Sequence, residues 1–196
     1  DDANSNRIKK FYSKSKKEII PHEMNQDEFI ELRENIIESS FKSTLFYHIE
    51  YKKLVIIKRP NSYDNENIKL LKQEINNYSK INHQYIPKFY GTVDFNNIKC
   101  PVFEYINGDT LLNTDFSNFS ISDKISIIFQ LLLVFNYLHM NEFIYRDLKP
   151  CNVIIDQNKI AVVINFDKMI NKKSDINNDS QTVVSSSEFA APEINF

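Results

Sequence analysis

Apolar and polar positions divide the chain into apolar runs, and each run predicts one element. The runs at residues 55–58, 101–106 and 160–164 are short and rich in Val, Ile and Phe, which is typical of strands. Residues 67–81 and 125–138 are longer and are predicted to be helices, the second with apolar residues on most of its sides. The pattern therefore gives the order strand, helix, strand, helix, strand along the chain.

The beginning of the chain differs from the rest. Residues 1–26 carry a basic run that also contains serine, formed by Arg7, Lys9, Lys10, Lys14, Lys16 and Lys17. Such a run is typical of a solvated, flexible tail, and contact with acidic lipid or with a partner is the alternative. We therefore expect a tail over residues 1–26.

Composition excludes several classes of protein. The 196 residues are enough for one domain or a small two-lobed one, and a net charge of −2 provides no field for nucleic acid or a membrane surface. Two cysteines, Cys100 and Cys151, are too few for a disulfide scaffold and suit a reducing cytosol, so we expect a cytoplasmic protein. The longest apolar stretch contains Gln130 and Asn136, and we expect it to be too short to span a bilayer.

The strongest chemical signal is the segment Tyr-Arg-Asp-Leu-Lys-Pro-Cys-Asn at residues 145–152. Asp147 can accept the proton of an attacking hydroxyl, Lys149 can neutralise a γ-phosphate and Asn152 can ligate magnesium. The segment resembles the catalytic loop of protein kinases, H-R-D-L-K-P-x-N, and departs from it only at the first position. We therefore expect phosphoryl-transfer chemistry here.

The resemblance to protein kinases extends through most of the chain. Lys58 ends a segment similar to the V-A-I-K strand, and Glu74 on the predicted helix 67–81 is placed to pair with it. Residues 101–108 resemble the strand that leads into the hinge, with Phe103 as gatekeeper. Residues 191–193 read Ala-Pro-Glu, as at the end of an activation segment, so residues 172–187 are expected to be a mobile activation loop.

The resemblance implies an α+β, two-lobed fold, with a small antiparallel sheet and helix C in the first lobe and a mainly helical second lobe. The expected domain is 27–196, divided into an N-lobe at 27–105 and a C-lobe at 106–196. A complete kinase domain continues with further helices, so the resemblance also implies that the chain is truncated at its C-terminal end.

The resemblance also implies the ligands and their residues. The cofactors of the family are ATP and Mg²⁺, with Asp147 and Lys149 as catalytic residues and Asn152 and Asn165 as metal ligands. The residues expected at the cofactor are Ile37, Thr44, Ile56, Lys58, Glu74, Phe103, Glu104, Ile106 and Ile154. Lys149 is typical of serine/threonine kinases, and the local wording is also similar to the tyrosine-kinase-like group. A protein substrate or protein partner is expected.

Three departures affect the ligand chemistry. The metal-binding motif D-F-G is replaced by Asn165-Phe166-Asp167, and a neutral amide is a poorer ligand for a hard cation than a carboxylate. Loss of one such electrostatic group commonly costs about 10²–10³ in rate, and Asp167 is the alternative ligand. The glycine-rich loop is replaced by residues 37–42, which contain no glycine, and Ile56 stands where a small residue usually contacts the purine.

The structural skeleton is retained by contrast. Four aromatic residues, Tyr78, Phe89, Phe166 and Tyr145, occupy the positions expected to stack between the two lobes. A retained skeleton with altered ligand chemistry is typical of a pseudokinase that acts through binding or conformational control. The alternative is a working kinase that transfers the γ-phosphoryl group of ATP to Ser or Thr, with Asp147 as base.

Overall fold

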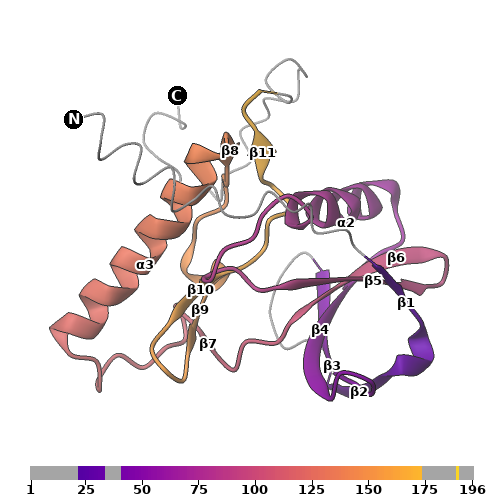
Figure 1. The fold of residues 1–196 in the computed structure, drawn as a ribbon, viewed down its shortest axis with the longest axis horizontal. Helices are drawn as coiled ribbons and strands as arrows, with labels where there is room; N and C mark the ends of the chain where they lie inside the picture. The colour runs from indigo at the N-terminus through magenta and orange to yellow at the C-terminus, as the bar shows by residue number, and fades with distance from the viewer. Residues whose placement is uncertain (1–21, 34–40, 174–188, 190–196) are drawn as a thin grey trace.

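A computed structural model describes residues 22–33, 41–173 and 189. The described chain forms two lobes (Figure 1). One lobe holds a six-stranded sheet and helix α2 (Asn65–Tyr78), and the other holds helix α3 (Ile121–Met140) with two smaller sheets. The expected two-lobed α+β fold is confirmed, and α3 is the one α-helix in the described part of the second lobe.

The large sheet is antiparallel except at one edge. Its strands are β1 (His22–Met24), β2 (Phe29–Arg33), β3 (Phe41–His48), β4 (Lys53–Pro60), β5 (Phe89–Phe95) and β6 (Ile98–Glu104). The strand order is β1-β5-β6-β4-β3-β2, and a single 3₁₀ turn, η1 (Gln26–Glu28), leads from β1 to β2. The predicted strands at 55–58 and 101–106 thus lie in β4 and β6. Apolar side chains of the sheet bury a core with α2, made of Met24, Phe41, Phe46, Val55, Ile57, Leu71, Val93, Cys100 and Val102.

Strand β1 pairs in parallel with β5, where His22 lies opposite Gly91. Gly91 has φ +131°, and a Cβ at this position would lie 2.2 Å from the carbonyl oxygen of His22. Only glycine allows both that backbone conformation and that approach. Met24 is buried beside it. The tail expected over residues 1–26 is therefore wrong for its last five residues, which form β1, the cap residue Asn25 and the start of η1. The basic run expected in that tail lies outside the described residues.

Helix α2 begins two residues before the prediction and ends three residues before it. Asp64 caps its first turn by accepting a hydrogen bond from the backbone N–H of Asn67 at 2.8 Å. After Ser79 the chain leaves the helix so that Ile81 packs into the core between the lobes. The buried face of α2 consists of Leu71, Glu74, Asn77 and Tyr78, and this face points toward the second lobe and the sheet.

Helix α3 is longer than the predicted helix at 125–138. A capping box formed by Ser120 and Asp123 starts it four residues earlier. Its 20 residues are longer than expected and, by length and composition alone, enough to cross a membrane, but one such helix is not a convincing membrane span. Its inner face is a core face, because Val134 and Leu138 are fully buried. Its outer face exposes Ile125, Ile128, Phe129 and Leu132.

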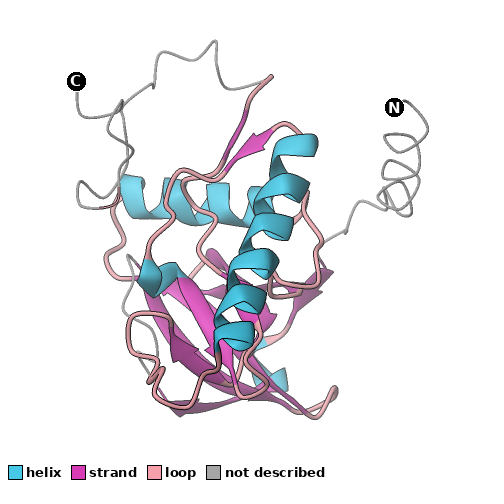
Figure 2. Cartoon of the chain, turned by 90° about the vertical axis from the view of Figure 1, so that its left-hand side faces the viewer, coloured by secondary structure: helices cyan, strands magenta, loops and turns pink. Residues whose placement is uncertain are grey.

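Three short strands lie between α3 and the large sheet (Figure 1), and Figure 2 shows the molecule from the side on which α3 lies in front of the strands. They are β7 (Gly108–Thr110), β9 (Val153–Asp156) and β10 (Ala161–Val163), in the order β10-β9-β7. A two-stranded sheet pairs β8 (Phe143–Ile144) with β11 (Ile170–Asn171). The predicted strand at 160–164 corresponds to β10. Between β8 and β9, the loop at 145–152 ends in the 3₁₀ turn η2 (Pro150–Asn152). The strands on both sides of the loop are fixed by pairing, β8 with β11 and β9 with β7 and β10, so the loop's polar side chains are held in place.

Candidate functional site

A cleft of about 450 Å³ lies between the two lobes. Its upper wall comes from β3, β4 and β6, and its lower wall from β7, β9 and the segment after β10. A cavity of this size suits a small organic ligand. The residues that line it are Arg33, Leu45, Ile56, Lys58, Tyr78, Pro87, Phe103, Glu104, Tyr105, Ile106, Asn107, Gly108, Asp109, Thr110, Asn113, Ile154, Gln157 and Ile164.

Six of the nine residues expected at a cofactor lie on this cleft. They are Ile56, Lys58, Phe103, Glu104, Ile106 and Ile154. Glu74 is absent from the lining and pairs with Lys58 behind it. Ile37 lies outside the described residues.

Thr44 was predicted at the cleft and does not line it. Its hydroxyl accepts a hydrogen bond from Nη2 of Arg59 at 3.0 Å, and its side chain is buried. Leu45 takes the place at the cleft, because successive side chains of a strand point to opposite faces. The register explains the choice, since Leu45 lies opposite Ile56, whereas Thr44 lies opposite Ile57 in the core.

Ile56 and Phe103 narrow the upper wall of the cleft. They lie opposite each other on the paired strands β4 and β6, and both are buried. A branched side chain and a phenyl ring occupy neighbouring positions, so the cleft contains less space beneath β4 than an alanine at position 56 would leave. This geometry agrees with the expectation of a crowded purine pocket.

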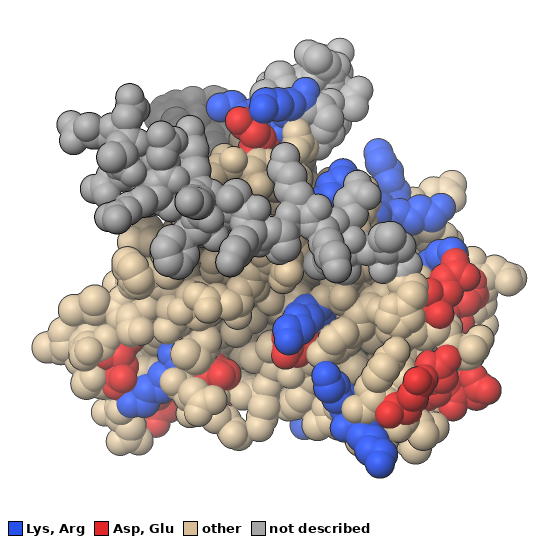
Figure 3. Space-filling model, viewed as in Figure 1, with Lys and Arg blue, Asp and Glu red and all other residues tan. Residues whose placement is uncertain are grey.

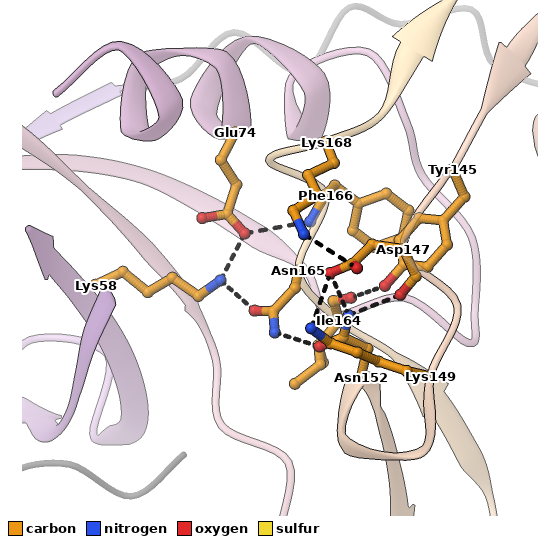
Figure 4. A network of polar contacts seen from close by, with 10 residues as sticks. All are labelled: Lys58, Glu74, Tyr145, Asp147, Lys149, Asn152, Ile164, Asn165, Phe166 and Lys168. Atoms are coloured by element: carbon orange, nitrogen blue, oxygen red, sulfur yellow. Dashed lines mark hydrogen bonds and ion pairs between the residues drawn. The ribbon is translucent and has the colours of Figure 1, made fainter. Parts of the chain in front are cut away.

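Lys58 links the cleft to a buried polar cluster, which is drawn in Figure 4. Its Nζ donates to Oε1 of Glu74 at 2.5 Å and to Oδ1 of Asn165 at 2.6 Å. The backbone N–H of Phe166 donates to the same Glu74 oxygen at 3.3 Å. Burial raises the pKa of Glu74, the charge of Lys58 opposes this rise, and the nearby charge of Asp167 adds to it. The predicted Lys58–Glu74 contact is therefore formed.

The two residues predicted as metal ligands are hydrogen-bonded to each other (Figure 4). Nδ2 of Asn165 donates to Oδ1 of Asn152 at 2.7 Å. Nδ2 of Asn152 in turn donates to Oδ2 and to the backbone oxygen of Asp147, both at 2.8 Å. A continuous chain of hydrogen bonds thus runs from Lys58 through both amides to Asp147.

Two ammonium groups flank the carboxylate of Asp147. Nζ of Lys168 lies 3.2 Å from Oδ1, and Nζ of Lys149 lies 3.4 Å from Oδ2. Asp147 itself is buried, while each lysine keeps between a fifth and a quarter of its side chain exposed, 21% for Lys168 and 24% for Lys149. The sequence analysis missed Lys168, which follows the altered D-F-G motif; its position next to that motif was the only available signal.

This donor set does not fit magnesium well. Mg²⁺ prefers carboxylate, phosphate and water oxygens in an octahedral arrangement. Here the side-chain oxygens of Asn165 and Asn152 already accept hydrogen bonds from Lys58 and from Asn165. Both carboxylate oxygens of Asp147 accept from nitrogen donors as well. Within the described part of the chain, no three His, Cys, Asp or Glu side chains gather in a way that could hold a metal ion.

The expected aromatic column crosses from one lobe to the other. Ring centroids of Tyr145 and Phe166 are 5.0 Å apart, those of Phe166 and Tyr78 are 4.9 Å apart, and those of Tyr78 and Phe89 are 6.3 Å apart. Phe103 also contacts Tyr78 at 4.4 Å. These rings lie in the core shared by the lobes, so they fix the loop at 145–152 relative to α2.

The surface is consistent with the charge predicted from composition. Charged side chains of both signs lie over the first lobe and at the lower left of the view, while the part of the second lobe between them and the grey residues is mostly uncharged (Figure 3). The two cysteines are free thiols, as expected. The Ala-Pro-Glu segment at 191–193 and most of the expected activation loop lie outside the described residues.

Comparison with known proteins gives a consistent result. A family model described as protein kinase domain matches residues 40–195. Maternal embryonic leucine zipper kinase of Xenopus tropicalis is 26% identical over 170 residues, which are 85% of this chain and 26% of that protein. The meiosis-specific serine/threonine-protein kinase MEK1 of Saccharomyces cerevisiae is 30% identical over 156 residues, which are 76% of this chain and 30% of that protein.

A bacterial protein is similar as well. Serine/threonine-protein kinase PrkC of Bacillus subtilis is 27% identical over 132 residues, which are 66% of this chain and 20% of that protein. The chain therefore spans less than a third of the length of each of these three relatives.

Proposed function

This chain belongs to the protein kinase family, and on that premise we propose that it is a domain of the serine/threonine type whose phosphoryl transfer is impaired. The domain acts through binding or through its conformation. Two of the relatives named above are called serine/threonine-protein kinases, and Lys149 agrees with that type. Placement in the tyrosine-kinase-like group and the status of a pseudokinase remain predictions.

One observation carries the proposal. Asn165 stands where the family has a metal-binding aspartate, and its amide bridges Lys58 and Asn152 through bonds of 2.6 and 2.7 Å. The amide thus holds both neighbours in hydrogen bonds that a cation at this position would have to displace. When bound, Mg²⁺ neutralises the charge of the transferred phosphoryl group in this family, and the residues that would hold it here are Asn152 and Asn165.

The second candidate function is that of an active kinase. The observation that favours it is the intact arrangement of Lys58 with Glu74 at 2.5 Å and of Asp147 beside Lys149. In that case Asp147 accepts the proton of a substrate hydroxyl, Lys149 binds the transferred phosphoryl group, and Asn152 and Asn165 would hold the magnesium ion.

We propose protein partners for either function, and a cytoplasmic location. The family acts on proteins, and Cys100 and Cys151 both remain free thiols.

The test is a phosphoryl-transfer assay with magnesium and ATP on a generic protein rich in Ser and Thr. We expect no transfer above that of the Asp147→Asn variant, which controls for contaminating kinases. Asn165→Asp should raise transfer measurably, because it returns a carboxylate to the metal position. Transfer by the unaltered protein that disappears in Asp147→Asn would instead establish the active kinase.

A further inference from the structure

The polar cluster between the lobes is built for an anion rather than for a metal ion. Three ammonium groups, those of Lys58, Lys149 and Lys168, lie around the chain of amides that ends at Asp147 (Figure 4). Lys58 pairs with Glu74, whereas the two other ammonium groups share the single carboxylate of Asp147. The oxygens that could bind a cation are the side-chain oxygens of Asn165, Asn152 and Asp147. Each of them accepts a hydrogen bond from a nitrogen donor. A metal ion would have to displace these donors, whereas an anion can share them.

We propose that the site binds the polyphosphate chain of a nucleotide without a divalent cation, and that the ammonium group of Lys168 supplies the positive charge there. This inference rests on the proposed function, because it concerns the polar cluster that Lys58 connects to the same cleft. The proposed ligand is a polyphosphate ester without a bound metal ion, and Lys168 determines the preference for this metal-free form.

The position of Lys168 is fixed by its backbone. Its carbonyl oxygen accepts a hydrogen bond from Nε of Arg146 at 2.8 Å, and the flanking carbonyls of Phe166 and Met169 accept from Nδ2 of Asn77 at 2.6 and 2.9 Å. The ammonium group is therefore held beside the loop at 145–152 by contacts with both lobes. A group placed in advance binds an anion at a lower entropic cost than a free surface lysine does.

The residues at positions 165 and 168 also make the charge of the cluster more favourable for an anion. A carboxylate at position 165 would stand between Lys58 and Asn152 and would add a negative charge, whereas the amide is neutral. Lys168 adds a positive charge 3.2 Å from Asp147. Together these two residues shift the local charge by two units relative to a site with a carboxylate at 165 and an uncharged residue at 168. The buried carboxylate of Asp167, where D-F-G has glycine, takes back one of these units. The remaining shift of one positive unit weakens the binding of a cation and strengthens that of a phosphate.

The cleft limits what the base of the nucleotide can contribute. Ile56 and Phe103 face each other at its upper wall, so the purine loses space. Lys58 lines the cleft and is the link through which a phosphate chain entering it reaches the cluster. Binding is therefore expected to depend mainly on phosphates.

The experiment is a thermal-shift titration of the whole chain with ATP, once in EDTA and once in excess magnesium. We expect the apparent dissociation constant in EDTA to be equal to or lower than that in magnesium. Tripolyphosphate should compete with ATP and adenosine should not. Lys168→Met should weaken binding in EDTA by about tenfold or more, the loss that one charge-assisted contact commonly gives.

The matched control is Lys173→Met, which removes an exposed lysine that pairs with Glu142 outside the cluster. It should leave binding in EDTA unchanged. Asn165→Asp provides a gain of function, because the returned carboxylate should make binding depend on magnesium. Equal effects of Lys168→Met and Lys173→Met, or tighter binding by the unaltered protein in magnesium, would overturn the inference.

The two proposals fail in different assays. Tighter binding in magnesium without phosphoryl transfer overturns the metal-free site and leaves the impaired kinase intact. Phosphoryl transfer that disappears in Asp147→Asn overturns the proposal of an impaired kinase. That result is measured as phosphate incorporation into the substrate protein and is independent of the thermal-shift titration.

Discussion

Replacing Lys58 with methionine should destabilise the domain strongly and in a way that depends on pH. The substitution keeps an unbranched side chain of similar length but removes the ammonium group that donates to Glu74 and Asn165. The side chain of Glu74 is 0% exposed, and among the described residues its second oxygen, Oε2, has no hydrogen-bond partner. Removal of Lys58 therefore leaves a buried carboxylate without its counter-charge.

The expected cost follows from that burial. Removing one partner of a buried ion pair costs about 3–5 kcal/mol near neutral pH, and we expect a loss in this range. Burial already raises the pKa of Glu74 with Lys58 present, and without Lys58 it rises further. The folded variant then holds a proton that the unfolded chain releases, so its stability falls as pH rises through the raised pKa and recovers below the ordinary value for glutamate.

The assay is urea denaturation followed by circular dichroism, at several pH values between about 4.5 and 8, a span chosen to start near the ordinary glutamate pKa. The double variant Lys58→Met with Glu74→Gln is the control, because it buries no charge and should regain most of the lost free energy of unfolding. A loss below about 1 kcal/mol in the single variant, unchanged over this pH range, would refute the reasoning, since it would mean that Glu74 is not buried as an ion.

Three further changes test other parts of the structure. Gly91→Ala should lower the free energy of unfolding by more than about 1 kcal/mol, because its Cβ would meet the carbonyl oxygen of His22, and hydrogen exchange should show the loss of β1. Ile56→Ala should cost about 2–4 kcal/mol of stability yet tighten ATP binding in a thermal-shift titration. Asp123→Asn should lower the melting temperature at pH 7 but not below pH 2, because hydrogen bonds from Lys159 and Ser120 lower the pKa of Asp123 to about 2, and its stabilisation is lost as pH falls through that value.

The sequence predicted those parts of the fold that depend on local patterns. Each predicted helix and strand is present, and the pairing of Lys58 with Glu74 was expected from motif positions alone. Helix ends were less accurate, because caps such as Asp64 and Ser120 and the packing of Ile81 decide them. A hydrophobic pattern records which residues are buried but not where a hydrogen-bonded turn starts.

Contacts between distant segments could not be predicted in the same way. The parallel pairing of β1 depends on Gly91, almost 70 positions later, and no local feature of residues 22–24 indicates a strand. Leu45 rather than Thr44 lines the cleft because neighbouring residues of a strand face opposite sides of the sheet. Which of the two faces the cleft depends on the register of β3 against β4, and the local sequence does not determine that register. The approach of Lys168 to Asp147 likewise depends on a contact between distant segments, because Nε of Arg146 donates to the backbone oxygen of Lys168.

The aromatic column between the lobes has a spectroscopic consequence. The chain contains ten tyrosines and no tryptophan, so its near-ultraviolet absorbance comes largely from phenol groups. Burial raises the pKa of Tyr78 and of Tyr145 well above the usual value for tyrosine. In an alkaline titration these two phenols should stay protonated after exposed tyrosines have ionised, and they should absorb as phenolates only when the column opens. The junction of the lobes therefore contains its own optical reporter, which needs no label.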